Sequence, residues 1–455
     1  MVADIKTAVK LGIGFRPELA LMIERRAERG ALHFVEILAE DYKRPQDIPQ
    51  ALKNLRKKGL EIIVHSTSLS LGQAEQKGTS GQKEYEKCLR KRARHLNEIA
   101  LLVDSPFVSD HIAFVRSGNL ESGHLLPVEH SAAMQAVLRR NIAIAREMLQ
   151  VPLVLENIAC TFDLPGAEMD EASFVAGVVE ENDCGLLLDL SNLFANAHNL
   201  NFSAAEYLEE LPLQRLAYVH LAGGTFKRGL YHDTHSHPLQ EQSLFLLEEL
   251  IKHMPTNMSV SRVMLERDDR FPPEDELNGE LDAIAAVLAK TEVASACAKI
   301  EAGNRIAGQS KLSTAAAQSA VADVALCVRQ EELVKSLLGM AAVPHWLHEK
   351  RIREAAEALS RKRLRTIKRA HPALDKHLPP DSGTGVFNLF EVDTDDEKRL
   401  DHSLRLYFAA FPSVHPDGCY ADSLAFLKFI KTAQKQKAES IYASAICFPT
   451  NEVKV

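Results

Sequence analysis

The sequence predicts an α/β protein, a TIM-like (β/α)8 barrel followed by a small, mainly α-helical C-terminal domain. One observation is that short apolar runs alternate with longer amphipathic segments up to about residue 290. Eight such alternations within this length are typical of a (β/α)8 barrel. The other observation is a change in character beyond this point, where Ala, Ser and Gln become frequent and helical patterns dominate.

The expected barrel strands are short apolar runs. They lie at 12–15, 33–38, 61–65, 107–111, 153–157, 185–189, 217–220 and 262–266. The helices expected between them carry apolar residues at three-to-four spacing, and they include 16–30, 84–102, 129–149, 170–182, 203–211 and 241–254. A doubly wound open sheet is the competing topology. It normally carries a Gly-rich nucleotide loop after its first strand, and G-I-G-F-R-P (12–17) matches that loop poorly.

Three parts are expected along the chain: the barrel at 1–290, a linker at 291–310 and the helical domain at 311–455. Residues 330–370 are strongly helical and basic, and helices are also expected at 395–411 and 422–436. Prolines and glycines interrupt 371–390, which predicts a loop.

Composition narrows the classes of partner. A net charge of −8 argues against a general nucleic-acid binder, which usually shows a basic face. No apolar run is long enough to span a membrane, and the first residues lack the apolar core of a signal peptide. The seven cysteines include no C-x-x-C pair, so reduced thiols in the cytoplasm are expected. We therefore expect a cytoplasmic protein without nucleic-acid or membrane partners.

Histidines concentrate in residues 218–237. His220, His232, His235, His237 and Asp233 all follow or end a short apolar run that predicts a buried strand. Imidazole and carboxylate groups are preferred ligands of Zn, Fe and Mn. A histidine-rich loop can equally be a solvated turn, so this stretch alone leaves metal binding open.

Similar residues end six of the eight predicted strands, or lie within one residue of the end. In a barrel these ends meet at one mouth. A single strand-end His or Asp is usually a cap or an ion-pair partner, but burying this many ionisable groups without cations would be costly. The eight candidate ligands are His65, His111, Glu156, Asp189, His220, Asp233, His235 and Glu266. They exceed the needs of one ion, so two or three metals are implied, and the absence of cysteine favours Fe, Mn or Zn.

Ten segments carry a resemblance to a known family. They are G-I-G-F-R-P (12–17), V-E-I-L-A-E-D-Y (35–42), V-H-S-T-S-L-S-L-G (64–72), S-D-H-I-A-F (109–114), L-L-P (125–127), L-E-N (155–157), L-L-L-D-L-S-N-L-F-A-N-A-H-N (186–199), V-H-L-A-G (219–223), H-D-T-H-S-H-P (232–238) and L-E-R-D-D-R-F-P-P (265–273). In this order they resemble the motifs of the DUF692 family, the multinuclear non-haem iron-dependent oxidative enzymes (MNIO). The resemblance covers about residues 11–290.

The resemblance implies a cluster of two or three Fe ions (Fe2+/Fe3+) that uses O2 to modify a residue, most often cysteine, in a ribosomally synthesised precursor peptide. It implies that the eight candidate ligands bind iron, and it assigns no catalytic residue beyond them. Asn157, Asn192, His198 and His237 are further candidates for the metal shell or its surroundings. Glu36, Glu40 and Tyr42, in and after the second strand, are candidates for lining the pocket.

Other interpretations stay open. A Zn- or Mn-dependent hydrolase or isomerase on a similar barrel, like sugar isomerases and AP endonucleases, would use the same kinds of ligand, and so would a non-catalytic metal-binding protein. Members of the family often work with a separate helical partner that recruits the precursor peptide. Residues 311–455 are interpreted as a fused equivalent of that partner, or as an appendage for stability or dimerisation. The basic run 361–369 would suit an acidic leader peptide, although charge runs are usually solvated faces.

Overall fold

The computed structural model describes residues 9–76, 78–255, 260–298, 319–370, 407–414, 422 and 424–429. The chain forms two compact units. The first comprises Met1–Phe114 with Leu125–Cys327, and the second comprises Val115–His124 with Val328–Val455. Among the described residues, no helix combines the length and the apolar character needed to cross a membrane.

The first unit is a closed barrel of parallel strands in the order β1-β12-β9-β8-β7-β4-β3-β2. These strands are β1 (Lys10–Gly14), β2 (Phe34–Leu38), β3 (Glu61–His65), β4 (Val108–His111), β7 (Leu153–Glu156), β8 (Gly185–Asp189), β9 (Leu216–Ala222) and β12 (Arg262–Glu266). The predicted barrel is confirmed, and each expected strand overlaps one of the eight. The pairing of β1 with both β12 and β2 closes the barrel, so no open sheet edge is left for a doubly wound topology.

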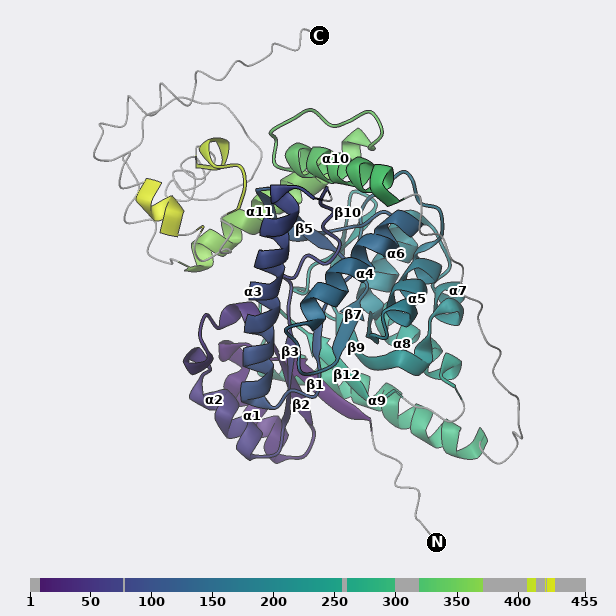
Figure 1. The fold of residues 1–455 in the computed structure, drawn as a ribbon. Coiled ribbons are helices and arrows are strands. Elements are labelled where there is room, and N and C mark those ends of the chain that lie inside the picture. Colours follow the sequence, from purple (N-terminus) through teal and green to yellow (C-terminus); the bar gives the residue numbers. More distant parts are fainter. Residues whose placement is uncertain are drawn as a thin grey trace. The chain divides into compact units, whose positions relative to one another are not determined.

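Helices surround the strands (Figure 1). They are α1 (Ala20–Glu28), α2 (Gln50–Lys57), α3 (Ser80–Val103), α4 (Ala132–Arg146), α5 (Glu171–Glu181), α6 (Leu190–Leu200), α7 (Ala204–Glu210), α8 (Glu241–His253) and α9 (Glu274–Ala298). Short 3-10 turns lie at Pro17–Leu19, Ala39–Asp41, Pro45–Asp47 and Leu213–Arg215. Side-chain oxygens accept hydrogen bonds from backbone N–H groups in the first turns of five helices and so fix where these helices begin. The capping residues are Thr79, Ser131, Asp170, Asp189 and Ser203.

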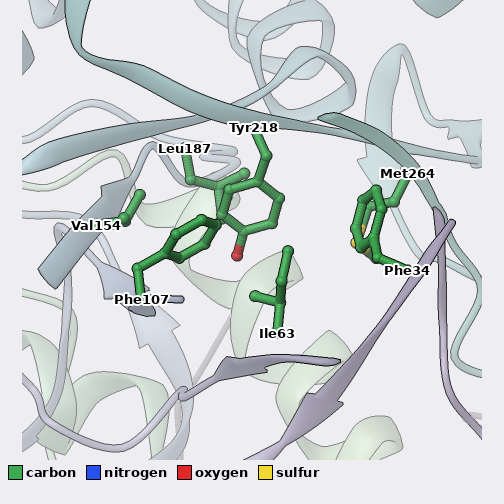
Figure 2. Packing of buried hydrophobic residues seen from close by; sticks show 7 residues of the cluster. All are labelled: Phe34, Ile63, Phe107, Val154, Leu187, Tyr218 and Met264. Carbon is green, nitrogen blue, oxygen red and sulfur yellow. The ribbon is translucent and has the colours of Figure 1, made fainter. Parts of the chain in front are cut away.

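A layer of buried apolar side chains fills the barrel interior, with one side chain from each of seven strand regions (Figure 2). It consists of Phe34, Ile63, Phe107, Val154, Leu187, Tyr218 and Met264. The eighth strand contributes Gly12, whose missing side chain leaves the space that the ring of Phe34 occupies. This layer closes the interior below the strand ends and gives the groups above it a rigid base.

The second unit combines a hairpin with helices of the C-terminal part. The hairpin strands are β5 (Phe114–Ser117) and β6 (Leu120–Leu126), which lie between β4 and α4 in the chain. The helices are the end of α10 (Ser319–Leu337), α11 (Glu349–Ala370) and helical residues at 407–410 and 424–429. The predicted helical character of the C-terminal part is confirmed. The expected loop at 371–390, and parts of the expected helices at 395–411 and 422–436, lie outside the described residues.

Arg363 and Asp422 form the buried centre of the second unit. The guanidinium binds the carboxylate through two contacts of 2.7 and 2.8 Å, and it also donates to the carbonyls of Phe411, Pro412 and Ser413. The Tyr407 hydroxyl donates to the same carboxylate at 2.8 Å. Arg363 belongs to the basic run 361–369, so this charge of the run is part of the unit's interior.

The expected domain boundaries at 290 and 310 stay predictions. Helix α9 continues to Ala298, and residues 299–318 lie outside the described residues. The expected start of the C-terminal domain at 311 therefore falls where the structure gives no description.

We expect that Gly12→Ala lowers the free energy of unfolding of the barrel by roughly 1–3 kcal/mol, because the added methyl group overlaps the Phe34 ring. Gly279→Ala in α9 is the matched control, since no atom lies within 4 Å of the position of its added methyl group. There the same change should leave stability unchanged or raise it by up to about 1 kcal/mol. Urea unfolding of both variants is the measurement, and equal midpoints would contradict this account of the core.

Candidate metal centre

The polar residues of the barrel interior stand two positions after the apolar layer. Because side chains alternate between the two faces of a strand, residues two apart face the same interior, about 7 Å further along it. This relation holds for Phe34 and Glu36, Ile63 and His65, Val154 and Glu156, Leu187 and Asp189, Tyr218 and His220, and Met264 and Glu266. In β4 the step occurs twice, from Phe107 to Ser109 and then to His111. The barrel therefore has a polar layer on top of an apolar one.

Four overlapping groups of possible ligands form in this polar layer, and three of them consist entirely of predicted ligands. The first is His65, His111 and Glu156, the second is Glu156, Asp189 and His220, and the third is Asp189, His235 and Glu266, each with ligand atoms within 4.8 Å of one another. Glu156 and Asp189 each belong to two groups. A shared carboxylate is suited to bridge neighbouring ions, so seven of the eight predicted ligands form a continuous series.

The distances show how closely the imidazoles surround the carboxylates. The Nε2 atoms of His65 and His111 lie 3.4 and 3.1 Å from Glu156 Oε2. The Nδ1 atom of His220 lies 3.5 Å from Glu156 Oε1 and 3.1 Å from Glu266 Oε2. Glu266 Oε1 in turn lies 3.3 Å from Nδ1 of His235. The four histidines therefore contact a common pair of glutamates, Glu156 and Glu266.

Six buried polar atoms of the predicted ligands make no hydrogen bond of normal geometry, although several of them lie within ion-pair distance of one another. They are Nδ1 of His111, Oε2 of Glu156, Oδ2 of Asp189, Nδ1 of His220, Oδ1 of Asp233 and Nε2 of His235. Buried nitrogen and oxygen atoms normally have partners, because an unpaired one costs free energy. Their concentration in one layer fits the binding of cations with N/O coordination, so the residues present suit a Zn, Fe or Mn site.

The pKa values of these groups indicate the same need for positive charge. Burial and the nearby carboxylates of Asp233 and Glu156 raise the pKa of Asp189 to about 8. Burial opposes the charge on His111, but the Glu156 and Asp110 carboxylates outweigh it and raise the His111 pKa to about 10. The pKa values of His220 and His235 are raised well above their usual range because carboxylates contact both rings. Protons thus balance the carboxylates in the metal-free chain, and bound cations would replace those protons.

Asp189 joins the site to the helix that follows it. Its Oδ1 accepts hydrogen bonds of 2.7 Å from the backbone N–H groups of Ser191 and Asn192 and caps α6, while its Oδ2 stays unpaired. Asn157 exchanges hydrogen bonds with the backbone of Asp189, and the Asn192 amide donates to the Asn157 carbonyl at 3.0 Å. The two asparagines therefore hold the backbone around the ligands.

Asp233 and His235 reach the site from the hairpin after β9, formed by β10 (Gly224–Lys227) and β11 (Leu230–Asp233). The Asp233 carboxylate contacts Nε2 of His235. Nδ1 of His235 also lies 3.3 Å from Asp268 Oδ2, and Asp268 pairs with Arg16. Asp268 and Arg16 stand two residues after Glu266 and Gly14, at the same end of their strands. Neither residue is among the predicted site residues, although each follows the end of a predicted strand.

The remaining predicted residues lie around the centre in different ways. Glu36 shares the polar layer and is described below with Ser109 and Tyr218. Glu40 accepts hydrogen bonds from Ser66 Oγ and Thr67 N and so holds the loop after β3. Tyr42 is buried beside the 3-10 turn Ala39–Asp41, with its backbone N–H donating to Ala39.

His198 and His237 belong to none of the ligand groups among the described residues. Nε2 of His198 donates to the Gly229 carbonyl at 3.2 Å, and its ring packs against Phe226. Nδ1 of His237 contacts the Thr234 hydroxyl at 2.6 Å. Both histidines contact the β10–β11 hairpin or the residues that follow it.

The fold and this polar layer define a TIM-barrel metal enzyme. Comparison with known families gives the more specific assignment: the family described as RiPP precursor modification enzyme MbnB/TglH/ChrH matches residues 10–289. The chain belongs to this family. A second family, the SCO6045-like C-terminal domain, matches residues 327–387.

Curated relatives carry the description UPF0276 protein. One from Streptomyces avermitilis is 34% identical over 410 residues, which cover 81% of this chain and 80% of the relative. One from Caulobacter vibrioides is 32% identical over 277 residues, which cover 60% of this chain and 92% of the relative. The match to the Streptomyces protein covers more of this chain than residues 10–289. The Streptomyces protein therefore also resembles the C-terminal part of this chain.

The similar solved structures have low sequence identity to this chain and TM-scores below 0.5. The structure of L-ribulose 3-epimerase has a TM-score of 0.42 and 13% identity, and the match covers 66% of this chain and all of that one. The IOLI protein with a bound zinc atom has a TM-score of 0.38 and 16% identity, with 63% of this chain and 98% of that one covered.

We expect that Asp189→Asn stabilises the metal-free protein at pH 7.5. The Asp189 pKa is raised from 3.8 to about 8, so the native state holds its proton while the unfolded state loses it above pH 4. As the pH rises from about 4 to about 8, the buried Asp189 therefore makes the folded state less stable relative to the unfolded state. The neutral Asn amide does not titrate and avoids this loss. Asn also retains the helix cap. A gain of about 1 kcal/mol would raise Tm by roughly 2–4 °C.

Differential scanning calorimetry of the chelator-treated proteins at pH 5 and pH 7.5 measures this effect. The difference in Tm between the variant and the wild type should be larger at pH 7.5. Added Fe(II) or Zn(II) should raise the Tm of the wild type more than that of the variant. A variant that is less stable than the wild type at pH 7.5 without metal would contradict the prediction.

Proposed function

We propose that this chain is an iron-dependent enzyme that uses O2 to oxidise a cysteine in a ribosomally synthesised precursor peptide. The observation that carries the proposal is the series of overlapping ligand groups, joined by Glu156 and Asp189, in a chain of the MbnB/TglH/ChrH family. When bound, two or three irons would supply electrons and open coordination positions for dioxygen and a thiolate.

The residues of this chain hold and orient those ions. Glu156 and Asp189, shared between groups, keep neighbouring positions close together, and the surrounding imidazoles come from different strands. Six of the ligands are buried at the ends of barrel strands, where the sheet holds their backbone, and the half-buried Asp233 and His235 lie at the end of the β10–β11 hairpin and just after it. Such preorganisation places a substrate and its oxidant in one orientation and excludes water, which supplies much of the rate in metal-templated reactions.

The charge of the site favours a substrate that arrives as an anion. The ligands include Glu156, Asp189, Asp233 and Glu266, so protons or metal cations must balance them, as the pKa values above indicate. Two divalent ions would equal that negative charge, and a third ion or a trivalent state would exceed it. A cysteine thiolate would then be stabilised next to them, because metal coordination lowers the pKa of a thiol.

Anaerobic metal analysis with Mössbauer spectroscopy and an oxygen electrode tests the metal and the reaction class. We expect two or three irons per chain and oxygen uptake that requires a cysteine-containing peptide encoded beside the gene. Glu156→Gln should lower the iron content, because this carboxylate belongs to two groups. Glu171→Gln is the matched control: Glu171 is a half-buried glutamate that accepts hydrogen bonds from Asn196 and Tyr207 and lies outside these groups.

Zinc or manganese alone, with no oxygen uptake after reconstitution with iron, would reject the oxidative function. It would favour the hydrolase or isomerase that the ligand types also permit. Equal loss of iron in the Glu156 and Glu171 variants would show that the effect is not specific to the proposed ligand.

For the second unit we propose a role in recruiting the precursor peptide, as a fused equivalent of a separate helical partner. The support is its helical character, together with the match of the SCO6045-like C-terminal domain family to residues 327–387. A barrel that belongs to a peptide-modifying family needs a means of holding a long flexible substrate, and a second unit in the same chain raises the effective concentration of that substrate.

We expect that Arg363→Met weakens binding of the peptide and leaves iron content unchanged. The substitution leaves Asp422 buried without its cation, which typically costs about 3–5 kcal/mol and would disorganise the second unit. Fluorescence anisotropy with a labelled peptide measures the affinity, and metal analysis of the same sample is the control. Wild-type peptide affinity in a variant whose second unit has become sensitive to protease would exclude a recruiting role.

A further inference from the structure

A continuous chain of buried hydrogen bonds runs between two predicted ligands, His65 and His220. Nδ1 of His65 lies 2.8 Å from Ser109 Oγ, and Ser109 Oγ lies 2.6 Å from the Tyr218 hydroxyl. The Tyr218 hydroxyl donates to Glu36 Oε2 at 2.7 Å, and Nε2 of His220 lies 3.0 Å from the same oxygen. None of the five side chains is more than 4% exposed.

The direction of each hydrogen bond in this chain follows from the number of protons. Glu36 as a carboxylate can only accept, so the Tyr218 hydroxyl and Nε2 of His220 both donate to it. The single Tyr218 proton is then used, so Ser109 must donate to the Tyr218 oxygen. The single Ser109 proton is used in turn, so Nδ1 of His65 must carry a proton and donate to Ser109.

This order determines which nitrogen of each imidazole can offer a lone pair when a cation replaces the proton in the polar layer. In His65 it is Nε2, which lies 3.4 Å from Glu156 Oε2 in the first ligand group. In His220 it is Nδ1, which lies 3.1 Å from Glu266 Oε2 and 3.5 Å from Glu156 Oε1. In both rings this nitrogen faces the polar layer, and the other nitrogen donates to the chain of hydrogen bonds.

We infer that Glu36, Tyr218 and Ser109 are positioning residues that set the tautomers of His65 and His220, so that both rings present a lone pair to the metals. One carboxylate thereby orients two ligands, one directly and one through two hydroxyl groups. Tyr218 serves two layers at once, because its ring packs in the apolar layer (Figure 2) while its hydroxyl belongs to the polar one. The inference rests on the proposed metal binding, but on neither the identity of the metal nor the substrate.

A different assignment of Glu36 has to be separated from this one. Glu36, His220 and Glu266 also lie close enough to form a ligand group of their own. If Glu36 bound a metal directly, Tyr218 and Ser109 would be ordinary partners of the polar layer. The two assignments make different predictions for the hydroxyl groups, because a direct bond between Glu36 and a metal would not need either of them.

The test uses the full-length chain, with Fe(II) and Zn(II) as probes. Tyr218→Phe keeps the ring in the apolar layer and removes the hydroxyl, and Ser109→Ala breaks the next link. Competition with a chromophoric chelator should show a loss of affinity of about 10–100-fold for each variant. Because both substitutions break the same chain, the double variant should bind within about threefold of either single one. Tyr85→Phe, which removes a buried hydroxyl bound to the Ser70 carbonyl, is the matched control with unchanged affinity.

A second readout reports the tautomers themselves. In Zn(II)-loaded protein labelled with [15N]histidine, the wild type should show His65 protonated at Nδ1 and His220 protonated at Nε2. Tyr218→Phe and Ser109→Ala should change the signal of His65, whereas a purely structural effect would leave both tautomers in place.

The outcomes separate the possibilities. Wild-type affinity in both hydroxyl variants, or losses that add in the double variant, would overturn the inference. Loss of one metal ion per chain in Glu36→Gln, with normal binding in Tyr218→Phe and Ser109→Ala, would make Glu36 a ligand instead. A wild-type chain that binds neither Fe(II) nor Zn(II) would reject the proposed metal centre itself.

Discussion

The structure depends on keeping several carboxylates and imidazoles close together in a place that water does not reach. Buried carboxylates repel one another and have lost their hydration, so cations or protons must balance their charge. The raised pKa values of His111 and Asp189 show this need for positive charge. A closed barrel can satisfy it because its strands are fixed by neighbours on both sides. The apolar layer below blocks the interior, so the polar side chains cannot relax away from one another.

In several ligands one polar atom of the side chain makes a hydrogen bond within the protein, and the other faces the candidate metal centre. Asp189 gives one oxygen to the cap of α6 and leaves the other unpaired. His220 donates from Nε2 to Glu36 and presents Nδ1 to the Glu156 and Glu266 carboxylates, and His65 donates from Nδ1 to Ser109. The protein-facing atom fixes the orientation of the side chain, so that little entropy remains to be lost when the other atom binds a metal.

The second unit is stabilised by a buried ion pair and the aromatic rings around it. Its described interior is organised by the ion pair of Arg363 and Asp422, with the aromatic rings of Tyr407 and Phe408 beside the guanidinium. The hairpin residues Val115–His124 group with it, although they follow β4 directly in the chain. The backbone N–H of Val414 donates to the Glu121 carbonyl at 2.9 Å, and Gly123, with φ of +70°, leaves room for the Val414 side chain. A segment inserted into the barrel sequence thus belongs to the unit formed by the C-terminal part.

Much of the barrel and its ligand series could be predicted from local patterns. Apolar runs marked the eight strands, and since parallel strands of a barrel end at one mouth, the residues at those ends were expected to meet. Seven of the eight predicted ligands indeed share overlapping groups, and Asp233 contacts one of them, His235. Helices α2, α6 and α9 were not among the expected segments. Helix α6 begins immediately after the ligand Asp189, so no loop residues separate strand β8 from this helix in the sequence.

What the sequence by itself determined is the alternation along each strand, because the period of two is a local property of the backbone. What only the tertiary structure decided is which side chains become neighbours across strands. Ser109 and Tyr218 are 109 residues apart, and Tyr218 and Glu36 are 182 apart, so no local pattern relates them. The register between strands brings their hydroxyl and carboxylate groups within hydrogen-bonding distance, and closure of the barrel is the physical reason that this register exists.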